Sequence, residues 1–143
     1  MCSSDLVVAA GQDGLWAVDV SDPVNPLVEG DLDTAGHVWD VALFAGHAYL
    51  ADEYNGLRVI DVRDPARPIE VGYYDVPGPS EFFSDIALAV DPSSGSSRVY
   101  AYVADALPGD TSLRIVDISL PANPVEVSRL PLAVGEKGDV RAY

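Results

Sequence analysis

The chain has 143 residues and a formal net charge of −15, from 23 Asp and Glu against eight Lys and Arg. This charge repels phosphate backbones and anionic membrane surfaces, which excludes nucleic acid as an expected partner. The single cysteine, Cys2, has no partner for a disulfide. The sequence shows neither the pattern of a signal peptide nor an apolar stretch of about 18 residues, so we expect no membrane insertion.

Taken in chain order, the main feature is one segment that is written three times. It reads GLWAVDVSDPVNP at residues 14–26, GLRVIDVRDPARP at residues 56–68 and SLRIVDISLPANP at residues 112–124. The first copy begins at Gly14 and the second at Gly56. A period of about 42 residues, filled with short β-branched runs and turn residues, predicts four-stranded blades of a β-propeller.

The second copy divides into strands at its own turn residues. Gly46-His47 and Asn55-Gly56 are turn signals, the latter because both residues tolerate positive φ. The segment Asp64-Pro65-Ala66-Arg67-Pro68 excludes a helix or a central strand, because its prolines lack donors and fix φ. The predicted strands are residues 38–45, 48–52, 57–62 and 69–75.

The third copy begins at Ser112, later than the spacing of the first two copies predicts. The additional residues fall in connections, around residues 77–79, 92–97 and 108–110. Because a strand cannot take up extra residues without losing its register, this placement supports the strand assignment. We expect an all-β, partial β-propeller of about three antiparallel four-stranded blades. Its parts are an incomplete blade without its first strand (1–36), a complete blade (37–78), a blade with loop insertions (79–134) and the start of another (135–143).

Closed propellers usually have about four to eight blades, so we expect this chain to be a fragment of a larger propeller. The expected partners are the remaining blades or another copy of the chain. The third strand of each blade is almost continuously apolar, which predicts coverage on both faces. We therefore expect Val59, Ile60, Ile115 and Val116 to be buried, and Glu29, Glu70 and Glu126 to lie on outer strands.

No catalytic signature is present, and we expect no catalytic residue, no metal and no cofactor. Asp19, Asp61 and Asp117 recur in the apolar strands, where we interpret them as acceptors for backbone N–H groups of the following turn. The segment Asp52-Glu53-Tyr54-Asn55-Gly56 lacks the alternating oxygen ligands of a calcium loop and is interpreted as a hairpin turn. His37 and His47 lie about 30 Å apart if the chain between them is extended, too far to share a metal.

Residues that the repeat does not require are the better functional candidates. In a propeller, the connections between blades and those between the second and third strands share one face. The residues on these connections are mainly aromatic and acidic, and a surface that combines the two is typical of a binding site. Trp39 and Phe83 have an alternative role in packing between blades. The candidates are His37, Trp39, Glu53, Tyr54, Glu81, Phe82, Phe83 and Asp110, with Lys137 on the same set of connections.

The strand at residues 57–62 (LRVIDV) and its counterpart at residues 113–118 (LRIVDI) resemble the LVIVD-repeat family. The resemblance implies a β-propeller, commonly in bacterial or archaeal secreted and cell-surface proteins, and supplies no catalytic residues. We therefore expect a non-enzymatic binding module that presents loops to a protein or glycan. The alternative is a fragment of a metal-dependent propeller enzyme whose site at the channel mouth is completed by other blades.

Overall fold

The computed structural model describes residues 5–76, 81–93, 95 and 97–132. This part of the chain contains eleven strands and no helix, and so no helix that could cross a membrane. The all-β prediction is confirmed. The strands are β1 Asp5–Ala9, β2 Leu15–Asp19, β3 Leu27–Leu32, β4 Asp40–Phe44, β5 His47–Ala51, β6 Leu57–Asp61, β7 Ile69–Tyr74, β8 Phe83–Asp91, β9 Arg98–Asp105, β10 Ser112–Asp117 and β11 Val125–Pro131.

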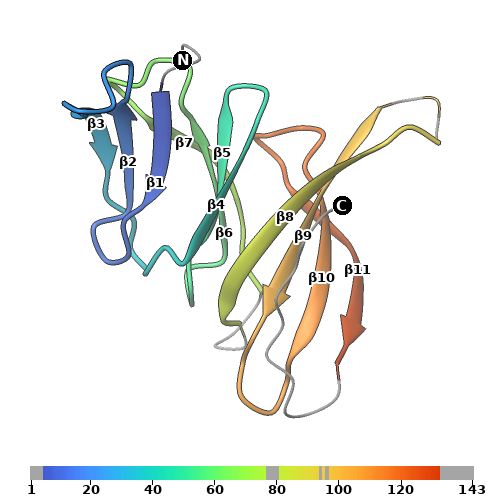
Figure 1. The fold of residues 1–143 in the computed structure, drawn as a ribbon. Helices are drawn as coiled ribbons and strands as arrows, with labels where there is room; N and C mark the ends of the chain where they lie inside the picture. The colour runs from blue at the N-terminus through green and yellow to red at the C-terminus, as the bar shows by residue number, and fades with distance from the viewer. Residues whose placement is uncertain (1–4, 77–80, 94, 96, 133–143) are drawn as a thin grey trace.

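The strands form three antiparallel sheets, each a meander in chain order: β1-β2-β3, β4-β5-β6-β7 and β8-β9-β10-β11. The sheets stand side by side in the order of the sequence (Figure 1). We call them the first, second and third blades, and their arrangement is that of a partial propeller. The four strands predicted for the second blade all appear in the structure, with small differences at their ends.

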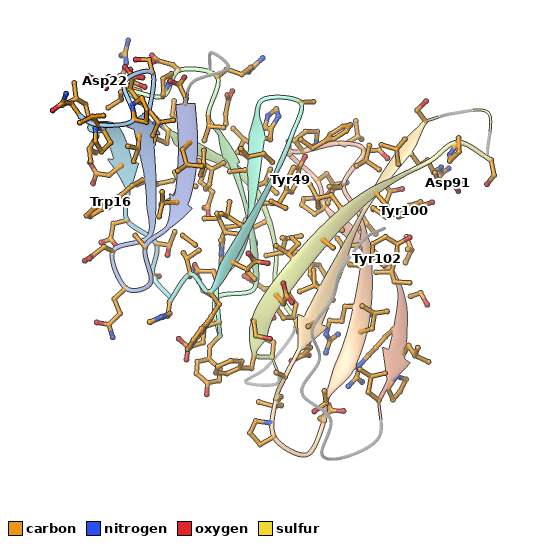
Figure 2. The ribbon with its side chains drawn as sticks, viewed as in Figure 1. Trp16, Asp22, Tyr49, Asp91, Tyr100 and Tyr102 are labelled. Atoms are coloured by element: carbon orange, nitrogen blue, oxygen red, sulfur yellow. The ribbon has the colours of Figure 1, made fainter. Side chains whose placement is uncertain are left out.

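Each blade packs its apolar face against the next blade. The core between the first and second blades includes Val7, Leu15, Leu50 and Ile60. The core between the second and third blades includes Tyr49, Val59, Phe83 and Val116, and Tyr49 lies between these two blades in Figure 2. The middle strands of the second blade are therefore buried on both faces, which explains why their sequence is apolar throughout.

Burial of the third strand is confirmed in most positions. Val59, Ile60 and Val116 are completely buried, whereas Ile115 is half-buried. Side chains alternate between the two faces of a strand, so Ile115 lies on the face of β10 opposite Val116, which faces the second blade. The three glutamates lie on the outer strands β3, β7 and β11 as predicted, although Glu126 is half-buried.

The turn between the last two strands has the same construction in every blade. Asp19 accepts a hydrogen bond from the backbone N–H of Ser21 (2.8 Å), and the equivalent Asp117 accepts one from Ser119 (2.9 Å). Asp61 accepts one from Arg63 (3.0 Å). The prediction that these aspartates bond to turn amides is confirmed.

Two turn assignments from the sequence are wrong in detail. The first hairpin of the second blade turns at Ala45-Gly46, which have φ of 48° and 78°, and His47 already belongs to β5. In the next hairpin the residues with positive φ are Glu53 (49°) and Gly56 (75°), so Asn55 is not one of them. The hairpin itself is present, closed by the bond from the N–H of Asn55 to the carbonyl of Asp52 (2.7 Å).

A β-bulge recurs between the last two strands of each blade. The register shifts between Ala17 and Val18 in the first blade and between Val59 and Ile60 in the second. It shifts between Ile115 and Val116 in the third. The extra residue always belongs to the outer strand, so the bulge is part of the repeated design.

Candidate functional site: an aromatic rim

Four aromatic side chains come into contact with one another. The loops that carry them lie at the lower end of the blades in Figure 1. The ring centroid of Trp39 lies 4.6 Å from that of His37 and 6.0 Å from that of Phe82. Tyr54 meets Phe82 edge to face at 5.3 Å. We call His37, Trp39, Tyr54 and Phe82 the aromatic rim. Trp39 is 50% exposed and Tyr54 is 62% exposed, so two of its members offer large apolar surfaces to a partner.

A backbone bridge between two blades explains why these rings meet. The N–H of Glu53 donates to the carbonyl of Phe83 (3.2 Å), and the N–H of Phe83 donates to the carbonyl of Glu53 (3.1 Å). Tyr54 and Phe82 are the chain neighbours of this pair, so the bridge brings their rings together. Glu53 adopts a positive φ, which is uncommon for a residue other than glycine, and the bridge holds it there.

Asp52 anchors the loops that carry the rim. Its side chain is completely buried and accepts hydrogen bonds from the Thr34 hydroxyl (3.1 Å) and the Asn55 amide (2.7 Å). Arg58 donates to the side-chain and backbone oxygens of Asn55, both at 2.7 Å. The loop before β4 and the turn that carries Tyr54 are therefore fastened to one carboxylate, which limits their freedom.

A second buried carboxylate, Asp105, positions Phe82. It accepts a bond from the Phe82 N–H (2.8 Å) and forms an ion pair with Arg114 (2.8 Å), whose side chain is only 5% exposed. Arg114 also pairs with Glu126 (2.9 Å), and the hydroxyl of Tyr74 in the second blade donates to the same carboxylate. This network joins the second and third blades next to the loop that carries Phe82.

A hollow of about 310 Å³ opens beside the rim. Gly36 lets its loop approach the second blade, because a Cβ there would lie 2.6 Å from the carbonyl oxygen of Asp52. The lining combines aromatic surface with amide and carboxylate groups, a composition that suits a polar ligand with an apolar face. The lining residues are Gln12, Ala35, Gly36, His37, Glu53, Tyr54 and Asn55.

The structure brings five of the predicted site residues together and places the other described ones elsewhere. His37, Trp39, Tyr54 and Phe82 form the rim, and Glu53 lines the hollow. Trp39 contacts the rings of His37 and Phe82 and stays half exposed, so it does not serve only as packing between blades.

Two other candidates are placed in the interior. Phe83 is completely buried, stacks on Tyr74 at 6.4 Å and packs between blades, which was its alternative role. Glu81 is 4% exposed and accepts a bond from the Val76 N–H (2.9 Å), and burial raises the pKa of its carboxyl. Neither side chain is available to a ligand at the surface.

Asp110 lies on the corresponding loop of the third blade, where it is exposed and pairs with Arg129. No contact joins its side chain to the aromatic rim among the described residues. Lys137 lies outside the described residues.

The two histidines have separate roles. His37 belongs to the rim, whereas a ring nitrogen of His47, at the start of β5, lies 3.1 Å from the carbonyl oxygen of Ala45. Within residues 5–132, apart from the positions not described, no group of three or more His, Cys, Asp or Glu side chains is arranged to hold a metal ion.

Sequence reasoning missed the residues that support the site. Asp52 was interpreted as part of a hairpin, and no role in a site was expected for Asp105, Arg114 or Gln12. The available signal was repetition itself, because Tyr-Leu-Ala-Asp and Tyr-Val-Ala-Asp place a buried aspartate at or directly after the end of the second strand in two blades.

Comparison with protein-family models identifies the LVIVD repeat at residues 6–34, 35–76 and 97–130. These segments cover most of the chain, so the chain belongs to the LVIVD-repeat family. The first two segments correspond to the first and second blades, and the third contains β9, β10 and most of β11 but not β8. It is a repeat module of the β-propeller type. No curated protein and no solved structure matches the chain.

Proposed function

We propose that this chain is part of a non-enzymatic binding module that presents the aromatic rim to a protein or glycan ligand. The observation that supports this function is the exposure of Trp39 and Tyr54 on loops held in place by buried carboxylates. Large aromatic side chains have few rotatable bonds, so they bind with a small loss of entropy. Hydrogen bonds within the chain hold their supporting loops, which lowers the cost of binding further.

The acidic surroundings bear on the kind of ligand. Glu53 lines the hollow beside Tyr54, and the chain has a net charge of −15. This field favours neutral or cationic ligands over anionic ones. We place the module outside the cell or at its surface on the family resemblance alone.

The test is a binding screen followed by paired variants. The chain is screened against arrays of neutral and cationic glycans and of basic peptides, and each hit is measured by titration calorimetry. In the variant Trp39→Ala/Tyr54→Ala we expect affinity to fall at least roughly tenfold, because exposed aromatic anchors dominate interface energies. Thermal unfolding should stay close to that of the unsubstituted chain.

The matched control is Phe44→Ala, which removes a partly exposed aromatic ring from the opposite end of the second blade. This variant should bind every hit normally. Equal binding by the rim variant, or equal loss in the control, would assign the ligand to another surface.

A further inference from the structure

Two glycines occupy one repeated position on the outer strands. Gly30 lies opposite Ala17 in the first blade, and Gly72 lies opposite Val59 in the second, each directly before the bulge. Neither glycine has a positive φ, so backbone conformation does not require glycine at either position.

The next blade explains both glycines. A Cβ on Gly30 would lie 2.2 Å from the carbonyl oxygen of Pro65, and a Cβ on Gly72 would lie 2.1 Å from that of Pro121. In both places the next nearest atoms are backbone atoms of the alanine that follows, at 3.0 and 3.1 Å. Real Cβ atoms do not approach this closely, and a backbone carbonyl cannot swing aside as a flexible side chain can. Each glycine is therefore required by the docking of the following blade.

We call Gly30 and Gly72 the glycine seats, and the turns that fill them, residues 64–68 and 120–124, the plugs. Each plug is closed by a backbone bond, from Arg67 to Asp64 (3.0 Å) and from Asn123 to Leu120 (2.9 Å), and each contains two prolines. A plug is thus stiff before it docks. The two seats have nearly the same distances to the same kinds of atom, so one mode of joining has been used twice.

The first blade carries a plug that has no seat. Residues 22–26 form the same turn, closed by the bond from Asn25 to Asp22 (3.0 Å). Its prolines Pro23 and Pro26 are exposed, whereas the final prolines of the two seated plugs are buried. Val24 is 84% exposed, and Leu6 and Trp16 of the same blade are also exposed.

The third blade has no glycine at the seat position. The residue of β11 that lies opposite Ile115, directly before the bulge, is Ser128. A blade docked there as at the two existing seats would drive its plug carbonyl into the Cβ of this serine. Ser128 is exposed in the structure.

We propose that the free plug of the first blade, residues 22–26, binds another blade of this repeat whose outer strand carries glycine at the seat position, and that Ser128 bars the third blade of this chain from that role. The array is accordingly directional. Two copies of the chain therefore do not join head to tail through this contact. The partner is defined by its chemistry as an LVIVD-type blade with an open glycine seat.

The experiment gives the full chain the seat it lacks. Ser128→Gly removes the Cβ, and the matched control Ser128→Ala removes only the hydroxyl. A photoreactive amino acid in place of Val24, in the free plug, reports which strand the plug touches. We expect Ser128→Gly chains to form concentration-dependent oligomers in sedimentation and to cross-link position 24 to β11. The unsubstituted chain and Ser128→Ala should do neither.

Two further variants keep the proposal falsifiable. Leu6→Asp in the Ser128→Gly background places a charge on the docking face and should abolish the new oligomers. Gly72→Ala fills an occupied seat and should lower the midpoint of thermal unfolding by roughly 5–10 °C, the cost of overpacking in a chain of this size. Identical behaviour of Ser128→Gly and Ser128→Ala, cross-links from position 24 to β11 in the unsubstituted chain, or an unchanged midpoint in Gly72→Ala would each overturn it.

Discussion

The two ends of the blades use buried and partly buried aspartates in different ways. At the end that carries the plugs, where Asp22 lies in Figure 2, every blade has at least one aspartate that accepts a hydrogen bond from the N–H two residues on. At the rim end, among the described residues, only the second and third blades have a buried aspartate, and Ala10 takes its place in the first blade. The aspartate at the plug end recurs because every blade needs the same turn. The residues at the rim end differ between blades, and this difference distinguishes a candidate site from the scaffold.

The largest effect should come from Asp105 at the rim end. Asp105→Ala leaves the buried guanidinium of Arg114 with one partner, Glu126, and should lower the free energy of unfolding by about 3 kcal/mol. Chemical denaturation measures this loss. The double variant Asp105→Ala/Arg114→Leu should regain much of it, because removing both charges leaves no buried ion behind. A loss below about 1 kcal/mol in the single variant would contradict the assigned role.

A smaller effect is expected at the plug end. Asp61→Ala removes the acceptor for the Arg63 N–H in a partly exposed turn and should cost about 1 kcal/mol in the free energy of unfolding. The equivalent change Asp117→Ala should cost a similar amount, since its turn is built alike. Denaturation curves of the two variants, run beside Asp105→Ala, test the ranking. A larger loss at Asp61 than at Asp105 would reverse the comparison between the two ends.

The smallest effect concerns pH. The side-chain hydrogen bond from Arg63 lowers the pKa of Asp61 to about 2, and bonds from the turn serines lower the pKa values of Asp19 and Asp117. A lowered pKa in the folded state means that these carboxylates stabilise the fold above about pH 4, and that this stabilisation is lost as the pH falls towards about 2.

The pH prediction is tested by unfolding the chain at a series of pH values. The Asp61→Ala variant should lose less stability than the unsubstituted chain between about pH 5 and about pH 2. Glu81, whose pKa burial raises, acts in the opposite direction and makes the net slope shallower. Parallel curves for the two chains would show that the Asp61 carboxylate does not contribute.

Much of the fold could be predicted because its signals are local. The period of the repeat, the Asp-Pro turns and the β-branched runs locate the strands and the capping aspartates within a short stretch of sequence. Four rim residues were also predicted, since propeller geometry assigns their loops to one face. Their contacts with one another were not predicted, because these depend on the bridge between Glu53 and Phe83.

What could not be predicted depends on contacts between repeats. Phe83 and Glu81 follow a loop insertion, and nothing local shows that the chain has already entered the interior there. The pairing of Asp105 with Arg114 and Glu126 needs the positions of three strands at once. The glycine seats recur in the sequence, but their reason is the backbone of the neighbouring blade.

The recurring bulge has a consequence for behaviour in concentrated solution. The outer strand of a blade presents unpaired backbone groups at its edge, and a straight edge of this kind invites pairing with strands of other molecules. An extra residue at the same place in β3, β7 and β11 interrupts the ladder and increases the local twist. The bulge therefore protects each blade against edge-to-edge aggregation, and because it lies within the repeat, each duplication copied that protection together with the blade.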